Sequence, residues 1–275
     1  MNSTLRKISL SLQVDITWIR TKGIPYKWRY LAKKYLFLIF PYLFWDKTSH
    51  TYALSLFGKK VYIPNKEHIA FLQGTYTDHA YLKKYIQPNA IVIDVGAHVG
   101  EFALVCATIL HAKEVFSFEP VKRSYDLLEQ NTPFRAYYGA IGTEKIQKIY
   151  VAENTVASSG FSNTKKEETE LTPCISPDHI SEIVSLDHID LFKIDVEGME
   201  YDVLMASKET LRKSLYIIVE LSLHREATNK AVQTIELLHE IIPHVELIHI
   251  GSIFTKHHQT RQIAVDMLFY NSMHT

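Results

Sequence analysis

The stretch IVIDVGAHVGEFALVCATILHAKEVFSFEP, residues 91–120, decides the fold of this chain. It opens with a short apolar run, IVIDV (91–95), and it ends with a second one, EVFSFE (114–119). Between them, FALVCATIL (102–110) has the length and composition of a buried helix. Because a strand, a helix and a second strand follow one another, we expect two parallel strands joined by a crossover helix.

The same alternation continues toward the C-terminus. Strands are expected at 136–141, 148–153, 191–196 and 216–221, and helices at 123–131, 201–213 and 229–242. The polar residues 154–172 are expected to form a solvated loop. VELIHI (245–250) and IAVDMLFY (263–270) predict a β-hairpin that gives the sheet an antiparallel edge. The pattern as a whole predicts an α/β fold with a doubly wound, mostly parallel sheet.

The N-terminal part of the chain has a different character. Residues 1–50 look mainly helical and contain no motif of chemical meaning. TYALSLFGKKVYIP (51–64) predicts a β-hairpin, because two strand-like runs flank a glycine. A helix is expected over 76–87. We therefore expect a mainly helical extension over 1–50 and one main domain over 51–275, which the hairpin leads.

The composition is that of an ordinary globular protein. The chain has 275 residues, and its 30 Lys and Arg residues balance its 30 Asp and Glu residues. A formal net charge of zero gives no general electrostatic reason to expect a nucleic acid partner. Two cysteines, Cys106 and Cys174, do not suggest a disulfide framework or a zinc site. With no secretory signal visible, we expect a cytoplasmic protein.

One apolar segment outside the main domain stands out. YLFLIFPYLFW (35–45) is continuously apolar and aromatic, and several Lys and Arg residues precede it. A membrane-spanning helix needs about 20 apolar residues, so this run is too short, and Pro41 interrupts it. Two interpretations remain open. The segment is either buried against the protein or a second copy of it, or residues 25–47 rest on the inner face of a membrane.

The strongest chemical signal is the turn that follows the first strand. Asp94 ends that strand, and two glycines, Gly96 and Gly100, follow it. In doubly wound sheets a ligand binds beyond the carboxyl ends of the strands, where glycines let the backbone turn and approach it closely. The spacing is GxxxG after an acidic residue, not the GxGxxG of a dinucleotide site. An oxidoreductase that uses a dinucleotide is therefore a remote alternative.

The second signal is an acidic residue at the end of the next strand. Glu119 ends EVFSFE and lies 19 residues after Gly100. A carboxylate in this place can accept hydrogen bonds from both hydroxyls of a ribose. Asp94 and Glu119 on successive strand ends therefore predict a site for a nucleoside cofactor.

The third signal is a group of charged residues in KIDVEGME (193–200). Lys193 and Asp195 share one face of a strand, and Glu197 follows at its end. Charges within a buried strand are costly unless they are paired or functional. The alternative to a functional role is an internal ion pair of Lys193 with Asp195 that orients the loop.

Together these signals resemble the FkbM family of methyltransferases. The resemblance rests on IDVGAHVGEFAL (93–104), FSFEP (116–120), LFKIDVEGMEYDVL (191–204) and IIVEL (217–221). It covers roughly residues 51–222, and His98 stands where the family usually has Asn. It implies a class I, Rossmann-like fold and methyl transfer from S-adenosylmethionine, typically to a hydroxyl of a sugar, glycan or natural product.

The resemblance also assigns residues. The cofactor is expected to contact Asp94, Gly96, Ala97, His98, Gly100, Glu119, Pro120, Ala140 and Asp195. A neutral hydroxyl is a weak nucleophile that benefits from a base. Asp195, Glu197 and His224 are the expected catalytic residues, with Glu220 a further candidate, and Ser158 and Ser159 are weak candidates beside the adenine. We expect no bound metal, although Asp195 and Glu197 carry oxygen ligands suited to magnesium. A scaffold protein that binds the cofactor without catalysis is the alternative.

Overall fold

The computed structural model describes residues 27–56, 59–66, 68–151, 168–222, 228–257 and 262–274. The chain forms two compact units, Met1–Lys84 and Tyr85–Thr275. The hairpin expected to lead the main domain lies in the first unit, while the predicted domain boundary at residue 50 stays a prediction.

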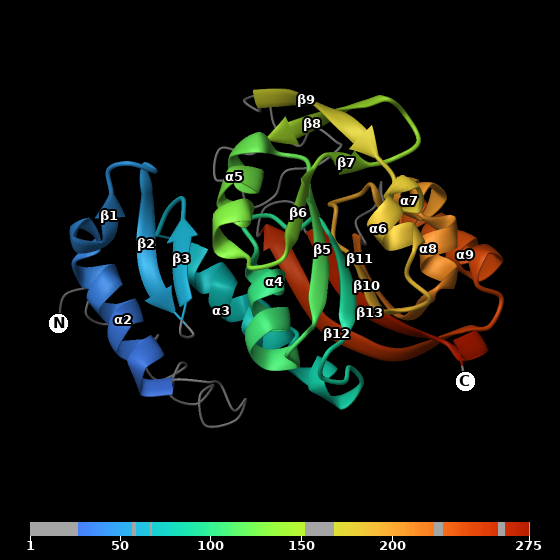
Figure 1. Cartoon of the computed structure of the whole chain (residues 1–275), viewed down its shortest axis with the longest axis horizontal. Helices are drawn as coiled ribbons and strands as arrows, with labels where there is room; N and C mark the ends of the chain where they lie inside the picture. Colours follow the sequence, from blue (N-terminus) through green and yellow to red (C-terminus); the bar gives the residue numbers. More distant parts are fainter. Residues whose placement is uncertain are drawn as a thin grey trace. The chain divides into compact units, whose positions relative to one another are not determined.

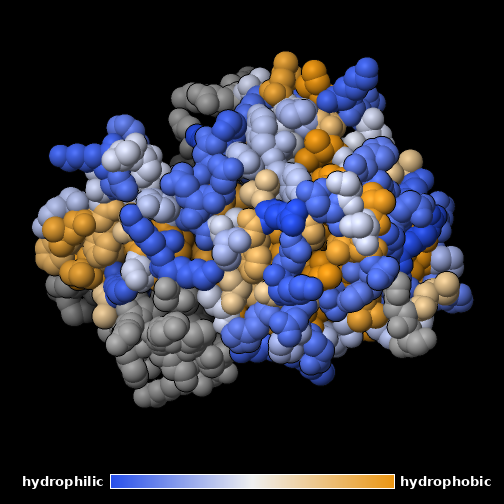
Figure 2. All heavy atoms as spheres, viewed as in Figure 1, coloured by the Kyte–Doolittle hydropathy of each residue, from blue (hydrophilic) through white to orange (hydrophobic). Residues whose placement is uncertain are grey.

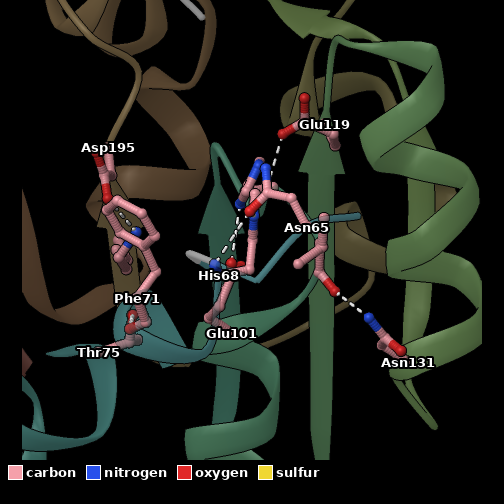
Figure 3. A network of polar contacts seen from close by, with 11 residues as sticks. Asn65, His68, Phe71, Thr75, Glu101, Glu119, Asn131 and Asp195 are labelled. Atoms are coloured by element: carbon pink, nitrogen blue, oxygen red, sulfur yellow. Dashed lines mark hydrogen bonds and ion pairs between the residues drawn. The ribbon is translucent and has the colours of Figure 1, made fainter. Parts of the chain in front are cut away.

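The first unit contains a helix, a small antiparallel sheet and a second helix. Its elements are α2 (Lys27–Ile39), η1 (Pro41–Phe44), β1 (Trp45–Asp46), β2 (Thr51–Leu56), β3 (Lys59–Ile63), α3 (His68–Asp78) and η2 (Ala80–Lys84). Strands β2 and β3 confirm the predicted hairpin, in which Leu54 pairs with Val61. The helix predicted over 76–87 is wrong in its bounds, because the main helix begins at His68. The side chain of Asn65 starts it by accepting a hydrogen bond from the backbone N–H of His68, at 3.2 Å (Figure 3).

The second unit is built on a seven-stranded sheet. Its strands are β4 (Ile91–Val95), β5 (Glu114–Glu119), β6 (Arg135–Tyr138), β10 (Ile189–Ile194), β11 (Ser214–Ser222), β12 (Val245–His257) and β13 (Gln262–Asn271). Their order across the sheet is β12-β13-β11-β10-β4-β5-β6. Only β13 runs antiparallel to its neighbours, and it lies one place in from the edge. The strand order reverses between β4 and β10, which confirms the doubly wound fold.

Helices cover both faces of this sheet, as Figure 1 shows. They are α4 (Glu101–Val105), the π-helical η3 (Cys106–Leu110), α5 (Lys122–Asn131), η4 (Pro177–His179), α6 (Ser181–Val184), α7 (Glu200–Ala206), α8 (Lys208–Arg212), α9 (Thr228–Ile241) and η5 (Ser272–His274). Figure 1 places α4 and α5 on one face and α7, α8 and α9 on the other. The helix expected over 201–213 is divided in two at Ser207.

Two sequence predictions near the sheet are wrong. The strand expected over 136–141 is broken at Gly139, and its second half, β7 (Ala140–Ile141), joins a separate sheet with β8 (Ile146–Val151) and β9 (Glu168–Ile175). A Cβ on Gly139 would lie 2.9 Å from Ile175 Cδ1 and 3.1 Å from the carbonyl oxygen of Pro173, so a larger residue here would require these neighbours in β9 to shift. Residues 168–172, expected in a loop, belong to β9 because they pair with β8.

The two faces of the sheet differ in character. Alternate residues of the central strands, such as Ile93, Phe116 and Phe192, enter the main hydrophobic core together with Leu204 of α7 and Leu238 of α9. Side chains alternate across a sheet with period two, so the residues between them point to the other face. That other face carries the polar residues of the candidate site.

Candidate active site

A stripe of polar side chains crosses the sheet near the carboxyl ends of its strands. Asp94 of β4 pairs in register with Ser117 of β5 and with Lys193 of β10. Paired residues of neighbouring strands share a face, so Glu119, two residues after Ser117, shares it too. Glu220 of β11 lies on the same face, because it comes two residues after the partner of Lys193. The stripe therefore contains the switch point of the sheet, where ligands bind in this fold.

Gly96 shapes the turn beyond β4. Its φ is +84°, and a Cβ there would lie 1.8 Å from the carbonyl oxygen of Asp195. The backbone of Asp195 also donates to the carbonyl of Val95, at 3.0 Å, which holds the ends of β4 and β10 together. The N–H groups of Gly96 and Ala97 both donate to Phe118 on the other side, at 3.0 Å. Only glycine permits this approach of two strand ends.

The rest of the glycine loop is held in an uncommon backbone conformation. His98 and Gly100 have φ values of +51° and +97°, in the left-handed region. His and Asn are among the residues that adopt this region more readily, which explains why His98 can replace the family's Asn. The side chain of Asn131 fixes the loop by donating to the carbonyl of Val99, at 2.7 Å, as Figure 3 shows.

Glu119 is oriented by the backbone around it. Its two carboxylate oxygens accept hydrogen bonds from the N–H of His98, at 2.8 Å, and of Val121, at 2.9 Å. Figure 3 shows the first of these contacts. The side chain is buried, and burial raises the pKa of Glu119 to about 7, against the opposing effects of His98 and the two N–H donors. Each carboxylate oxygen has a second lone pair, so the group can still accept hydrogen bonds from a ligand.

Asp94 and Lys193 form the buried centre of the stripe. Lys193 Nζ lies 3.6 Å from Asp94 Oδ1 and 3.0 Å from Asp195 Oδ2. Burial raises the pKa of Asp94 to about 6, although Lys193 lowers it. Burial alone would lower the pKa of Lys193, but Asp195 and Asp94 outweigh this effect and raise it. The internal ion pair considered from the sequence is therefore present, and it reaches Asp94 as well as Asp195.

Several of these polar atoms lack a hydrogen-bond partner among the described residues. Neither carboxylate oxygen of Asp94 nor the hydroxyl of Ser117 makes a hydrogen bond to the part of the chain that the structure describes. Both residues are fully buried. Buried polar groups are nearly always hydrogen-bonded, so these atoms indicate a place where a ligand or water completes the structure.

A group of carboxylates lies at the carboxyl ends of β10 and β11, where Asp195 and Glu197 follow β10 and Glu220 lies in the last part of β11. One oxygen from each of Asp195, Glu197 and Glu220 lies within 4.8 Å of the others. Glu200 is buried nearby, where it accepts a hydrogen bond from the N–H of Gly198 at 2.7 Å, and burial raises its pKa to about 7. Carboxylates this close repel one another, so they favour a proton, a hydroxyl donor or a cation between them.

The other residues predicted for the site lie outside the polar stripe or outside the described residues. Pro120 follows β5, and its carbonyl accepts a hydrogen bond from Thr172. Ala140 is buried in β7, one residue after Gly139, whose N–H donates to the carbonyl of Glu119 at 3.1 Å. His224, Ser158 and Ser159 lie outside the described residues.

Some site residues were missed by the sequence analysis. Glu101, in the first turn of α4, is buried and lies 2.9 Å from Nδ1 of His98. Burial alone would lower the pKa of His98, but Glu101 outweighs it and raises that pKa. Ser117 and Asn131 were missed as well. An acidic residue directly after the second glycine was the one available signal, since the serine and the asparagine gain meaning only from the register of β5 and the packing of α5.

Comparison with known proteins identifies the family. The model of the methyltransferase FkbM domain matches residues 94–262, which are more than half of the chain and contain both the glycine loop and the acidic residues. The chain belongs to the FkbM methyltransferase family. The resemblance drawn from the sequence is therefore confirmed.

Two characterised relatives share part of the sequence. The hexuronic acid methyltransferase AglP of Haloferax volcanii is 28% identical over 158 residues, which are 54% of this chain and 63% of that protein. The methyltransferase sdnD of Sordaria araneosa is 26% identical over 179 residues, 49% of this chain and 66% of that protein. The chain thus matches less than two thirds of the length of either relative.

Solved structures show weaker similarity. Trm5b from Pyrococcus abyssi is 12% identical, with a TM-score of 0.49 over 80% of this chain and 55% of that chain. TYW2 of M. jannaschii, solved in complex with AdoMet, is 11% identical, with a TM-score of 0.42 over 80% of this chain and 86% of that chain. These values are too low to carry a conclusion about function.

Proposed function

We propose that this protein transfers a methyl group from S-adenosylmethionine to a hydroxyl group of a sugar. The observation that carries the proposal is the polar stripe, in which Asp94 and Glu119 lie on one face at the ends of neighbouring strands. Membership in the FkbM methyltransferase family supports it, and so does the relative named as a hexuronic acid methyltransferase.

The residues of the stripe fit the cofactor. Glu119 is held by two backbone N–H groups so that its free lone pairs can accept the ribose hydroxyls. Both oxygens of Asp94 lack hydrogen bonds within the described structure and suit the positively charged methionine portion. A Cβ at Gly96 would clash with the carbonyl oxygen of Asp195, so glycine permits the tight turn beside which the cofactor would lie. The sulfonium, when bound, supplies an electrophilic methyl group, so the protein mainly has to align an acceptor and exclude water.

The three carboxylates at the carboxyl ends of β10 and β11 are suited to the acceptor. Side-chain oxygens of Asp195, Glu197 and Glu220 lie close together. The backbone of Asp195 also contacts the turn at Gly96, so this group is next to the proposed cofactor site. Any of them can accept the proton that a hydroxyl loses as its oxygen attacks the methyl carbon. Asp195 and Glu197 are the first candidates for the base. The same negative charge would repel an acceptor that carries its own carboxylate, so we propose an uncharged sugar.

Isothermal titration with S-adenosylmethionine, followed by a methyl-transfer assay, tests the proposal. The acceptors are a panel of uncharged sugars and uronic acids, and the product is detected by mass spectrometry. We expect micromolar binding and methylation of an uncharged sugar. Folded protein that fails to bind the cofactor contradicts the proposal, and preference for uronic acids contradicts its choice of acceptor.

Variants separate the roles of the residues. Glu197→Gln is expected to keep cofactor binding while turnover falls about a hundredfold or more, because a base is lost. Asp187→Asn, an exposed acid just before β10, is the matched control and should retain turnover.

Removal of metal ions with EDTA should leave turnover unchanged, because the positive charge of Lys193 already balances the negative charge of Asp195. A loss of turnover that magnesium restores would assign the carboxylates to a metal.

The alternative is a scaffold protein that binds the cofactor without catalysis. It predicts cofactor binding with no turnover of any sugar in the panel, and Glu197→Gln would then change nothing measurable.

A further inference from the structure

The first unit exposes an apolar surface that the methyl-transfer site does not explain. Six large apolar or aromatic side chains between residues 36 and 45 are at least 41% exposed. They are Leu36, Ile39, Phe40, Tyr42, Leu43 and Trp45, here called the outer patch. On the face that Figure 2 shows, hydrophobic atoms gather in the region of α2 and β1. Contiguous exposed apolar surface of this kind marks an interaction site in a water-soluble protein.

Part of the outer patch comes from helix α2 and the residue that follows it, and this helix is apolar on two sides. Leu31 and Phe37 of α2 are buried, as expected for the inward side of an amphipathic helix. Leu36, Ile39 and Phe40 lie on the outward side, where polar residues normally occur. Burial, one of the two interpretations left open by the sequence, therefore applies to one side of the helix only.

Aromatic side chains pack against one another beneath and within the outer patch. The buried ring of Phe37 contacts Phe44 and Tyr52 edge to face, with ring centroids 5.6 and 5.1 Å apart. Trp45 contacts Tyr52 at 5.0 Å. Aromatic side chains that are held in this way lose little freedom when the surface binds a partner.

The charge of the first unit indicates which kind of partner the outer patch would bind. The balanced net charge of the chain hides a strong asymmetry, because the first unit, residues 1–84, contains 14 Lys and Arg residues but only 4 Asp and Glu residues. The single acidic residue beside the outer patch, Asp46, accepts backbone hydrogen bonds from Thr48 and Ser49. Lys47, the next residue, is exposed. An apolar surface on a basic unit complements a surface that is both apolar and anionic.

We propose that the outer patch docks this protein onto a membrane surface that carries anionic lipids. Aromatic and aliphatic side chains enter the boundary of headgroups and acyl chains, while lysines interact with lipid phosphates. Helix α2 has 13 residues, and none of the described helices is long and apolar enough to cross a membrane. A symmetric contact with a second copy would bring two basic units together, which charge repulsion opposes.

Sedimentation of the full chain with lipid vesicles tests the proposal. The vesicles contain phosphatidylcholine alone or a mixture with phosphatidylglycerol. We expect the chain to sediment with the anionic vesicles, to bind neutral vesicles more weakly, and to be released as the salt concentration rises. A chain that stays in solution with anionic vesicles overturns the proposal, and so does binding that ignores both lipid charge and salt.

The apolar contribution is tested by the triple variant Leu36→Gln, Ile39→Gln and Leu43→Gln. Glutamine at the first two positions keeps the helix propensity of α2 nearly unchanged, and Leu43 is exposed in η1, so the fold should survive. Vesicle binding is expected to fall roughly tenfold or more, because three exposed aliphatic groups that would enter the lipid are lost. Unchanged binding by a folded variant overturns the proposal.

A matched control replaces equally exposed side chains of the second unit. Ile146, Leu171 and Val184 are 61%, 70% and 49% exposed, and glutamine at these three positions should leave vesicle binding unchanged.

The charge contribution is tested by Lys47→Glu, which should weaken binding to anionic vesicles roughly fivefold or more. Lys113→Glu in the second unit is the control and should leave this binding unchanged.

Light scattering identifies the main competing partner. A monomer that binds anionic vesicles supports membrane docking. A dimer that the triple glutamine variant converts to a monomer, together with a failure to bind vesicles, would assign the outer patch to a second copy of this chain.

Discussion

At the scale of single residues, the site depends on two carboxylates, Glu119 and Asp94, whose pKa values are raised by burial. Glu119 is buried, and it accepts two backbone hydrogen bonds that orient its side chain. Asp94 is shielded and lacks hydrogen bonds within the described residues. Backbone hydrogen bonds thus orient Glu119, whereas Asp94 has only its ion pair with Lys193 and no hydrogen bond among the described residues. This difference predicts distinct effects of pH and of substitution.

Replacing Glu119 by Gln should weaken cofactor binding. The amide removes the negative charge and one acceptor oxygen, so the ribose hydroxyls lose charge-assisted hydrogen bonds worth about 1.5–3 kcal/mol. We expect the Kd for S-adenosylhomocysteine to rise about tenfold to a hundredfold by isothermal titration. The control is Glu114→Gln at the start of the same strand, where the glutamate pairs with Arg135 at the surface. Equal affinity of Glu119→Gln and wild type would remove Glu119 from the site.

Cofactor binding should also depend on pH. The pKa of Glu119 is about 7 and that of Asp94 about 6 in the free protein. The cofactor interacts with the ionised forms, so binding releases protons, and the Kd should rise as the pH falls from about 8 to about 6. Titration in buffers of different ionisation enthalpy would detect this release. Glu119→Gln should show a flatter dependence, and a Kd that is independent of pH in wild type would contradict the assignment.

At the scale of elements, the ends of β4 and β10 are joined through a single glycine. The carbonyl of Asp195 occupies the space that a Cβ on Gly96 would need. The strands themselves were predicted closely from sequence, because IVIDV and EVFSFE are short apolar runs bounded by turns. Their register was not, and register is what places Ser117, Asp94 and Lys193 side by side. Sequence therefore located the strands but not the stripe that they form.

Gly96→Ala should destabilise this junction. The added methyl group clashes with the backbone of Asp195, and φ of +84° is unfavourable for alanine, so unfolding should become easier by about 2–4 kcal/mol in urea titrations. Gly142→Ala serves as the control, because its Cβ would meet only Cys174 Sγ, at an ordinary 3.5 Å. A Gly96→Ala protein as stable as the control would show that the two strand ends are farther apart than described.

At the scale of the whole molecule, the fold of the second unit was more predictable than the organisation of the first. The rhythm of strands and helices is a local pattern, so it gave the doubly wound sheet correctly. The break at Gly139 and the pairing of residues 168–172 with β8 depend on contacts between distant segments, which no local pattern records. The charge asymmetry between the units was hidden because the two halves cancel in the total.

The most direct test of the proposed cofactor site is a crystal structure of the protein with S-adenosylhomocysteine bound. We expect the ribose hydroxyls within hydrogen-bond distance of Glu119, the methionine portion over the turn at Gly96 and beside Asp94, and the vacant methyl position facing Asp195 and Glu197. A cofactor bound elsewhere, or a Glu119 side chain that contacts only the protein, would contradict the claim that these two strand ends hold one nucleoside.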